Sequence, residues 1–161
     1  MKRGFTLIET LVYLALYTII VGGVLASVYS MFESSAHNET VAMLEEEGDY
    51  LAAMIDWVLS EAVSIQSPIH SGNLLSVTHS DGSTVGISSP GAYIRIQENT
   101  APKQTLNNSN VSVILLMFVH TLATSNGYNP ESVLVSFTLL ATTSDGHVLS
   151  RDFSVLKYLH K

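Results

Sequence analysis

The sequence predicts an α+β protein in which one long N-terminal helix packs against a C-terminal antiparallel β-sheet. Three patterns carry this prediction. An uncharged apolar run follows the first few residues, residues 33–67 repeat apolar side chains at helical spacing, and residues 68–161 alternate with a period of two around Asp-Gly turns. The length of 161 residues corresponds to about one domain.

The composition argues against several functional classes. Without Cys the chain cannot form disulfides, thiolate zinc sites or iron–sulfur clusters. A net charge of −7 with seven basic residues opposes nucleic-acid binding through a basic face. A mean hydropathy of +0.31 with only 13% charged residues argues against an acidic disordered chain. We expect no direct nucleic-acid binding, no metal or other cofactor, and no small-molecule substrate.

The first element is an apolar helix. No charged residue occurs from Thr10 to Phe32, a run of 23 residues. As a helix this run is about 35 Å long, enough to cross a hydrocarbon core of about 30 Å. Lys2 and Arg3 precede it and should remain cytoplasmic. The expected topology is a single pass through the cytoplasmic (inner) membrane, with an extracytoplasmic C-terminal part.

The second element continues the helix as an acidic, amphipathic segment. Eight acids and no Lys or Arg lie between Glu33 and Glu61. We expect helix to about Ile65, because Pro68 disfavours helix at the residue before it. Gly22, Gly23 and Gly48 are points where it could bend. Apolar residues spaced three and four apart form one stripe: Val41, Leu44, Gly48, Leu51, Ile55, Val58, Ala62 and Ile65.

The remaining elements are strands. Asp81-Gly82 and Asp145-Gly146 are strong hairpin signals. We expect five to seven strands in one antiparallel sheet, with the apolar stripe of the helix covering its apolar face. The predicted strands are Leu74–His79, Thr84–Ser88, Ala92–Gln97, Val111–Thr121, Val133–Thr143 and Val148–Leu159, and Asn99–Asn110 is predicted as a polar loop.

The N-terminus allows three interpretations. A cleaved secretory signal would have a shorter apolar core, without an acid between the basic residues and the run. An uncleaved signal anchor satisfies the topology equally well. The third interpretation is a resemblance. Gly4, Phe5 and an acid at Glu9, followed by about twenty apolar residues, resemble the prepilin leader of type IV pilins and type II secretion pseudopilins.

This resemblance implies a division of the chain and a set of partners. Residues 1–4 would be a leader that prepilin peptidase cuts between Gly4 and Phe5, and Phe5 would then be N-methylated. Residues 5–32 would form the transmembrane and filament-core helix, 33–67 the amphipathic helix, and 68–161 a β-rich head. Glu9 would set register by pairing with a neighbouring subunit's amine. The partners would be other pilin or pseudopilin subunits and the inner-membrane assembly platform.

Departures from major subunits favour a minor pilin or a J-type or W-type minor pseudopilin. The chain lacks a C-terminal Cys pair, a Pro in the middle of the apolar run and an acidic calcium loop. Retention of Glu9 differs from the tip pseudopilin, which lacks this acid. The function implied is that of a structural subunit of a pilus or pseudopilus. The alternative is a signal-anchored extracytoplasmic interaction domain that never polymerises.

No pattern in the sequence indicates catalysis. Six His residues lack metal-ligand spacing, so solvated or core positions are favoured for them. The order of Asp56, Ser60 and His70 does not define a catalytic triad. The chain has neither a P-loop nor a dinucleotide-binding glycine motif. The run Glu45–Glu47 is interpreted as a solvated helix face, with docking to a basic groove on a different protein as its functional alternative.

Overall fold

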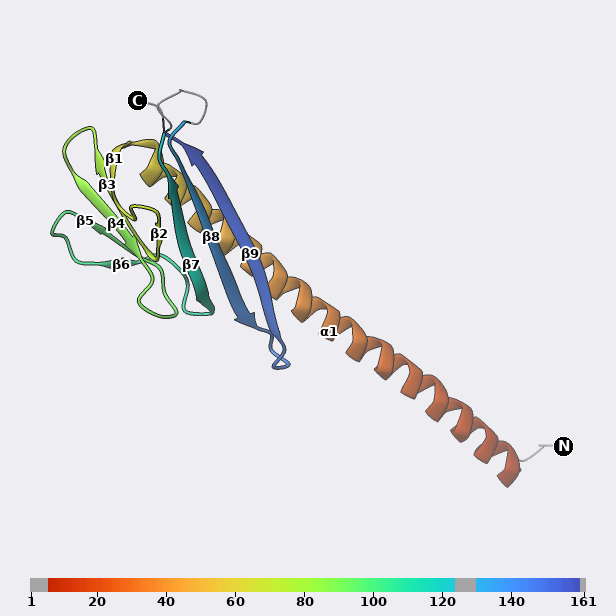
Figure 1. Cartoon of the computed structure of the whole chain (residues 1–161). Helices are drawn as coiled ribbons and strands as arrows, with labels where there is room; N and C mark the ends of the chain where they lie inside the picture. The colour runs from red at the N-terminus through yellow and green to blue at the C-terminus, as the bar shows by residue number, and fades with distance from the viewer. Residues whose placement is uncertain (1–5, 124–129, 160–161) are drawn as a thin grey trace. The chain divides into compact units, whose positions relative to one another are not determined.

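The computed structural model describes residues 6–123 and 130–159, which form one long helix and nine strands. The helix α1 (Leu7–Ser60) has 54 residues, and the described residues after it form strands and loops (Figure 1). The strands are β1 (Ala62–Ser67), β2 (Ser71–Gly72), β3 (Leu74–His79), β4 (Thr84–Ser88), β5 (Arg95–Glu98), β6 (Gln104–Thr105), β7 (Val111–Thr121), β8 (Ser132–Thr142) and β9 (Val148–Tyr158). The α+β prediction is confirmed.

The chain divides into two compact units, and α1 passes through both. The first ends at Glu39, and the second begins at Thr40 and contains the end of α1 with all the described strands. The helix continues through Gly22, Gly23 and Gly48, where bends were considered possible. It ends at Ser60 rather than near Ile65.

The early end of α1 corrects the predicted boundary. Residues 62–67 form β1, which pairs with β3, and Ile65 lies opposite Val77. Ala62 and Ile65 are three apart, so they fitted the helical pattern. In the structure, register shifts on either side of Ser64–Ile65 make β1 irregular, and both residues are partly buried. Pairing with a distant strand therefore determined the conformation of residues 62–67, which local periodicity assigns to the helix.

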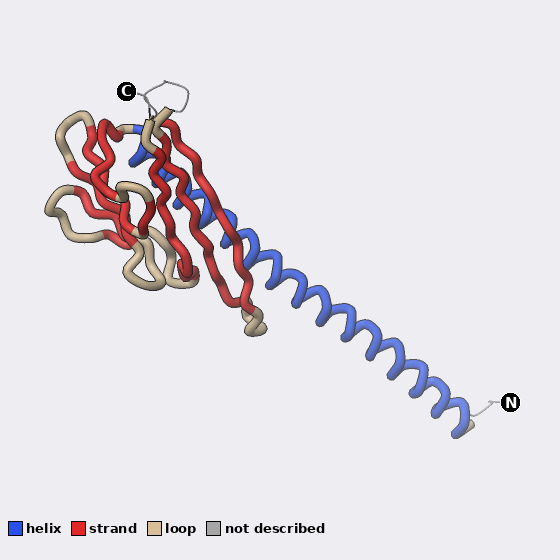
Figure 2. Tube along the Cα trace, in the orientation of Figure 1, coloured by secondary structure: helices blue, strands red, loops and turns tan. Residues whose placement is uncertain are grey.

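The strands form two antiparallel sheets, where one was expected. The first has the order β1-β3-β4-β5-β6 and the second the order β2-β7-β8-β9. Figure 2 shows the strands of both sheets in red, after the single blue helix. Both predicted hairpins are confirmed: Asp81-Gly82 joins β3 to β4, and Asp145-Gly146 joins β8 to β9. Gly82 and Gly146 have φ values of 85° and 90°, which glycine adopts without steric cost.

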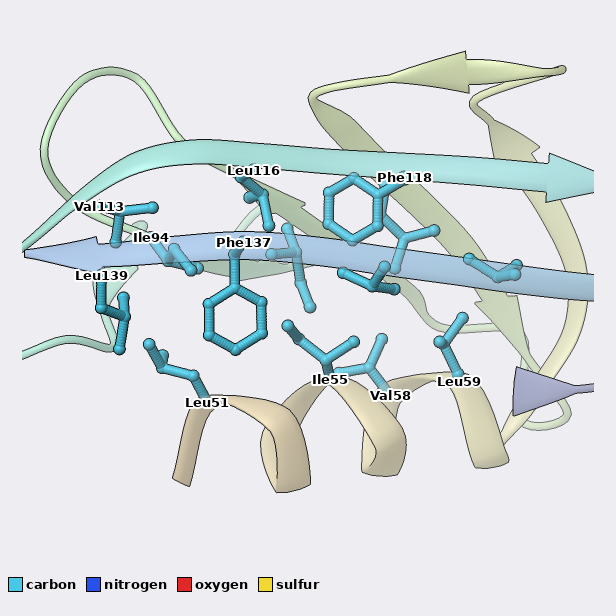
Figure 3. Packing of buried hydrophobic residues seen from close by; sticks show 14 of the residues in the cluster. Leu51, Ile55, Val58, Leu59, Ile94, Val113, Leu116, Phe118, Phe137 and Leu139 are labelled. Carbon is cyan, nitrogen blue, oxygen red and sulfur yellow. The ribbon is translucent and has the colours of Figure 1, made fainter. Parts of the chain in front are cut away.

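One hydrophobic core joins the two sheets to α1 residues from Leu44 onward. Leu51, Ile55 and Val58 from the predicted apolar stripe are completely buried. They face Phe118 of β7 and Phe137 of β8 (Figure 3). The stripe thus covers the sheets as predicted. Full burial of each such side chain is worth about 1.5–3 kcal/mol.

The alternation of buried and exposed side chains along strand β7 reverses midway. Val111 and Val113 face the core, whereas Leu116 and Phe118 do so further along. A bulge between Val113 and Leu115 leaves Ile114 without a partner in the ladder and 59% exposed. Because side chains alternate along a strand, one extra residue reverses which positions point inward.

Candidate functional site

The most unusual surface is the N-terminal half of α1, which is apolar around its whole circumference. Apart from Val21, which is half-buried, the large hydrophobic side chains from Leu7 to Phe32 are at least 42% exposed. An 18-residue window of α1 has a mean hydropathy of 2.2, and none of that window is buried. A helix that is hydrophobic all round belongs inside a membrane or in a packed core. This segment is therefore consistent with a membrane anchor.

Three hydroxyl groups of this segment have hydrogen-bond partners within the helix. The hydroxyls of Thr10, Thr18 and Ser27 donate to backbone carbonyls one turn earlier, at 3.3, 2.8 and 3.0 Å. In a hydrocarbon environment an unsatisfied hydroxyl would cost several kcal/mol. Back-bonding lets the segment carry these residues in an apolar surrounding.

Thr6 caps the N-terminus of α1. Its carbonyl accepts from the backbone N–H groups of Glu9 and Thr10 at 3.1 and 3.2 Å, and its Oγ1 lies 3.4 Å from the Glu9 nitrogen. Thr followed three residues later by Glu is the spacing of a capping box. The capping signal is visible in the sequence as Thr6-Leu7-Ile8-Glu9 and adds to the features predicted above.

The exposed carboxylate of Glu9 stabilises its own helix and is also the single charge of the apolar segment. As the acid of the first turn, it interacts favourably with the positive end of the helix dipole. It is also the only charge between Thr6 and Phe32. Gly4 and Phe5, the residues of the expected cleavage and N-methylation, lie outside the described residues.

Two of the six histidines are core residues with backbone partners. His79 Nε2 lies 3.0 Å from the Val58 carbonyl oxygen, one of the last carbonyls of α1, which have no partner within the helix. His120 Nδ1 lies 3.1 Å from the Pro68 carbonyl oxygen, and its Nε2 lies 2.9 Å from Glu131 Oε1. Among the described residues, no three His, Cys, Asp or Glu side chains converge as metal ligands.

The acidic run of α1 is more than a solvated face. Glu45 pairs with Arg151 of β9 at 3.3 Å, and Glu47 Oε1 accepts from the backbone N–H of Asn108 at 2.6 Å. Glu46, between them, is exposed. Together with the 2.8 Å pair of Lys157 and Asp56, these contacts join the acidic segment to the sheet that ends in β9 and to the loop before β7.

The architecture is pilin-like. One long apolar N-terminal helix packs, from Thr40 onward, against C-terminal antiparallel sheets. No protein-family model, curated protein or solved structure matches the chain. The likeness therefore rests on this architecture and on the N-terminal motif.

Proposed function

We propose that this chain is a minor type IV pilin or minor pseudopilin, a structural subunit that is cut between Gly4 and Phe5 and assembled into a pilus or pseudopilus. The observation that carries the proposal is the exposed apolar segment of α1, which has a single carboxylate in its first turn. The segment needs an apolar surrounding that the described chain does not supply. A bilayer and a bundle of similar helices both provide one.

Transfer between these two surroundings is energetically undemanding. Lipid chains and neighbouring apolar side chains are similar in polarity, so moving the segment gains or loses little hydrophobic free energy. The hydroxyls of Thr10, Thr18 and Ser27 keep their partners in both states, because those partners belong to the same helix. An external motor could therefore withdraw the helix from the membrane without breaking polar contacts inside it.

In this proposal, Glu9 sets the axial position of a subunit relative to its neighbours in the filament. An unpaired carboxylate in a helix bundle is strongly unfavourable, whereas a carboxylate paired with an amine is tolerated. The free amine created at Phe5 of a neighbouring subunit is the proposed partner. A subunit would then be retained only at the axial position that brings the two charges together.

Processing tests the proposal first. Co-expression of the full chain with a prepilin peptidase should reduce the mass by that of Met1–Gly4 and add one methyl group at Phe5. A Gly4→Val variant should keep its full mass. If the wild-type chain also keeps Met1 in a host that trims its other prepilins, the chain is a simple anchored interaction domain.

Substitution of Glu9 tests the register role. Glu9→Ala should insert and be cut normally but enter filaments at least tenfold less than the wild type. Glu9→Gln can preserve a capping box but carries no charge. Equal defects in the two variants would assign the effect to charge pairing. Normal incorporation of Glu9→Gln with poor incorporation of Glu9→Ala would assign it to helix capping.

A further inference from the structure

A groove with a volume of about 310 Å³ lies between the C-terminal part of α1 and strands β5 and β6. Its helical wall consists of Tyr50, Met54 and Trp57, at positions i, i+4 and i+7 on one helix face. Tyr50 and Trp57 are each 47% exposed. Two large aromatic side chains that remain half-exposed beside a concave surface are typical of a recognition site.

The opposite wall bears the only charge in the lining. Ile96 and Glu98 of β5 and Gln104 of β6 line the groove, and Glu98 is exposed. Arg95 does not line it, since neighbouring residues of a strand point to opposite faces. The described groove thus combines aromatic rings with one carboxylate and contains no base.

Most of the charges around the groove are acidic. Glu46 is exposed and lies one turn before Tyr50 on the same side of α1, and the exposed Asp49 directly precedes Tyr50 in the chain. Arg151 and Lys157, in contrast, pair with acids of α1 from the side of β9. The cations of β9 are therefore engaged by α1. The exposed Lys103 lies between the lining residues Pro102 and Gln104 and places one base at the rim of the groove. The exposed acids Glu46, Asp49 and Glu98 outnumber it, so the surroundings are acidic on balance.

The groove also borders an open sheet edge. Strand β6 is the last strand of its sheet, and both of its residues are exposed. An edge strand offers unpaired backbone groups to an extended peptide. Arg and Lys stack on Trp and Tyr faces through cation–π contacts and pair with carboxylates.

From this combination, we propose that the groove binds an extended basic segment of a partner protein, with an Arg or Lys side chain held between Trp57, Tyr50 and Glu98. The net charge of −7 disfavours a second copy of this chain as the partner. The proposal is independent of filament assembly, because it concerns only residues from Thr40 onward. It assigns the recognition surface of the head to the side of β5 and β6.

The test uses the full chain in non-ionic detergent micelles. Trp57 is the only tryptophan, so its fluorescence reports on the groove directly. An acetylated heptapeptide of alternating serine and arginine should change this fluorescence saturably, and added salt should weaken the binding. The same peptide with glutamine in place of arginine should bind at least tenfold more weakly.

Matched variants separate the groove from general electrostatic attraction. Glu98→Gln should lower the affinity about fivefold, and Tyr50→Ala about tenfold, with unchanged far-ultraviolet circular dichroism. Asp152→Asn removes the same charge from β9 and should alter the affinity less than twofold. Equal effects of Glu98→Gln and Asp152→Asn would overturn the proposal. So would the absence of saturable binding up to millimolar peptide, or tighter binding of maltoheptaose than of the arginine peptide.

Discussion

Gly48 is a position where α1 and β9 approach closely, and replacing it with Ala should destabilise the protein. A Cβ atom there would lie 2.0 and 2.2 Å from the Cζ and Cε1 atoms of Phe153. Carbon atoms in contact are about 3.5–4.0 Å apart, so the ring or the helix must move by roughly 1.5 Å. The Phe153 ring is stacked on Phe137 with centroids 5.3 Å apart, which restricts its retreat.

Two opposing effects set the magnitude. Ala is favoured over Gly within a helix by about 1 kcal/mol. Overpacking a filled site typically costs about 1–3 kcal/mol, and this overlap places Gly48→Ala at the upper end of that range. The expected net loss is about 1–2 kcal/mol, or a fall in Tm of about 3–8 °C. Thermal and urea unfolding of the full chain in detergent micelles, followed by near-ultraviolet circular dichroism, would measure it.

A double-mutant cycle identifies the cause. In a Phe153→Leu background, the additional loss from Gly48→Ala should shrink by about 1 kcal/mol or more, because the overlapping ring is gone. Gly22→Ala is the control, since nothing lies within 4 Å of a Cβ at that position. The reasoning is refuted if Gly48→Ala is as stable as the wild type, which would mean that the helix propensity gain outweighs the overlap.

Three further predictions concern the region from Thr40 onward. The pKa of Asp81 lies below its ordinary value of 3.8, because the Ser83 hydroxyl and then the Ser83 N–H donate to its carboxylate. The ionised Asp81 carboxylate therefore contributes to stability fully above pH 3.8, and this contribution disappears as the pH falls through the lowered folded-state pKa. Asp81→Asn should flatten this part of the acid-unfolding curve. His120→Leu should lower the free energy of unfolding, measured in urea at pH 7, by about 3 kcal/mol or more, because Glu131 loses its buried imidazole partner. Glu131→Gln should lower it less, since an amide N–H can donate to His120 Nε2. Leu51→Ala should cost about 2–5 kcal/mol by leaving a cavity in the core, and a loss below 1 kcal/mol would contradict the packing described for α1.

The candidate site could be predicted from the sequence in part. The apolar run, the position of Glu9 and the capping signal of Thr6 are all visible in the order of residues alone. The groove beside Tyr50 and Trp57 could not be predicted. Its two walls are about fifty residues apart in the chain, and only the packing of α1 against β5 and β6 brings them together.

Local features of the fold were determined by the sequence itself. The long helix, the buried stripe around Leu51 and Ile55, and both Asp-Gly hairpins follow from periodicity and turn chemistry within a few residues. Only the tertiary structure decided the end of α1 at Ser60, the division of the strands into two sheets, and the close packing of Phe153 against Gly48. These features depend on pairing and packing between distant residues, and local periodicity contains no information about which distant partner a segment will meet.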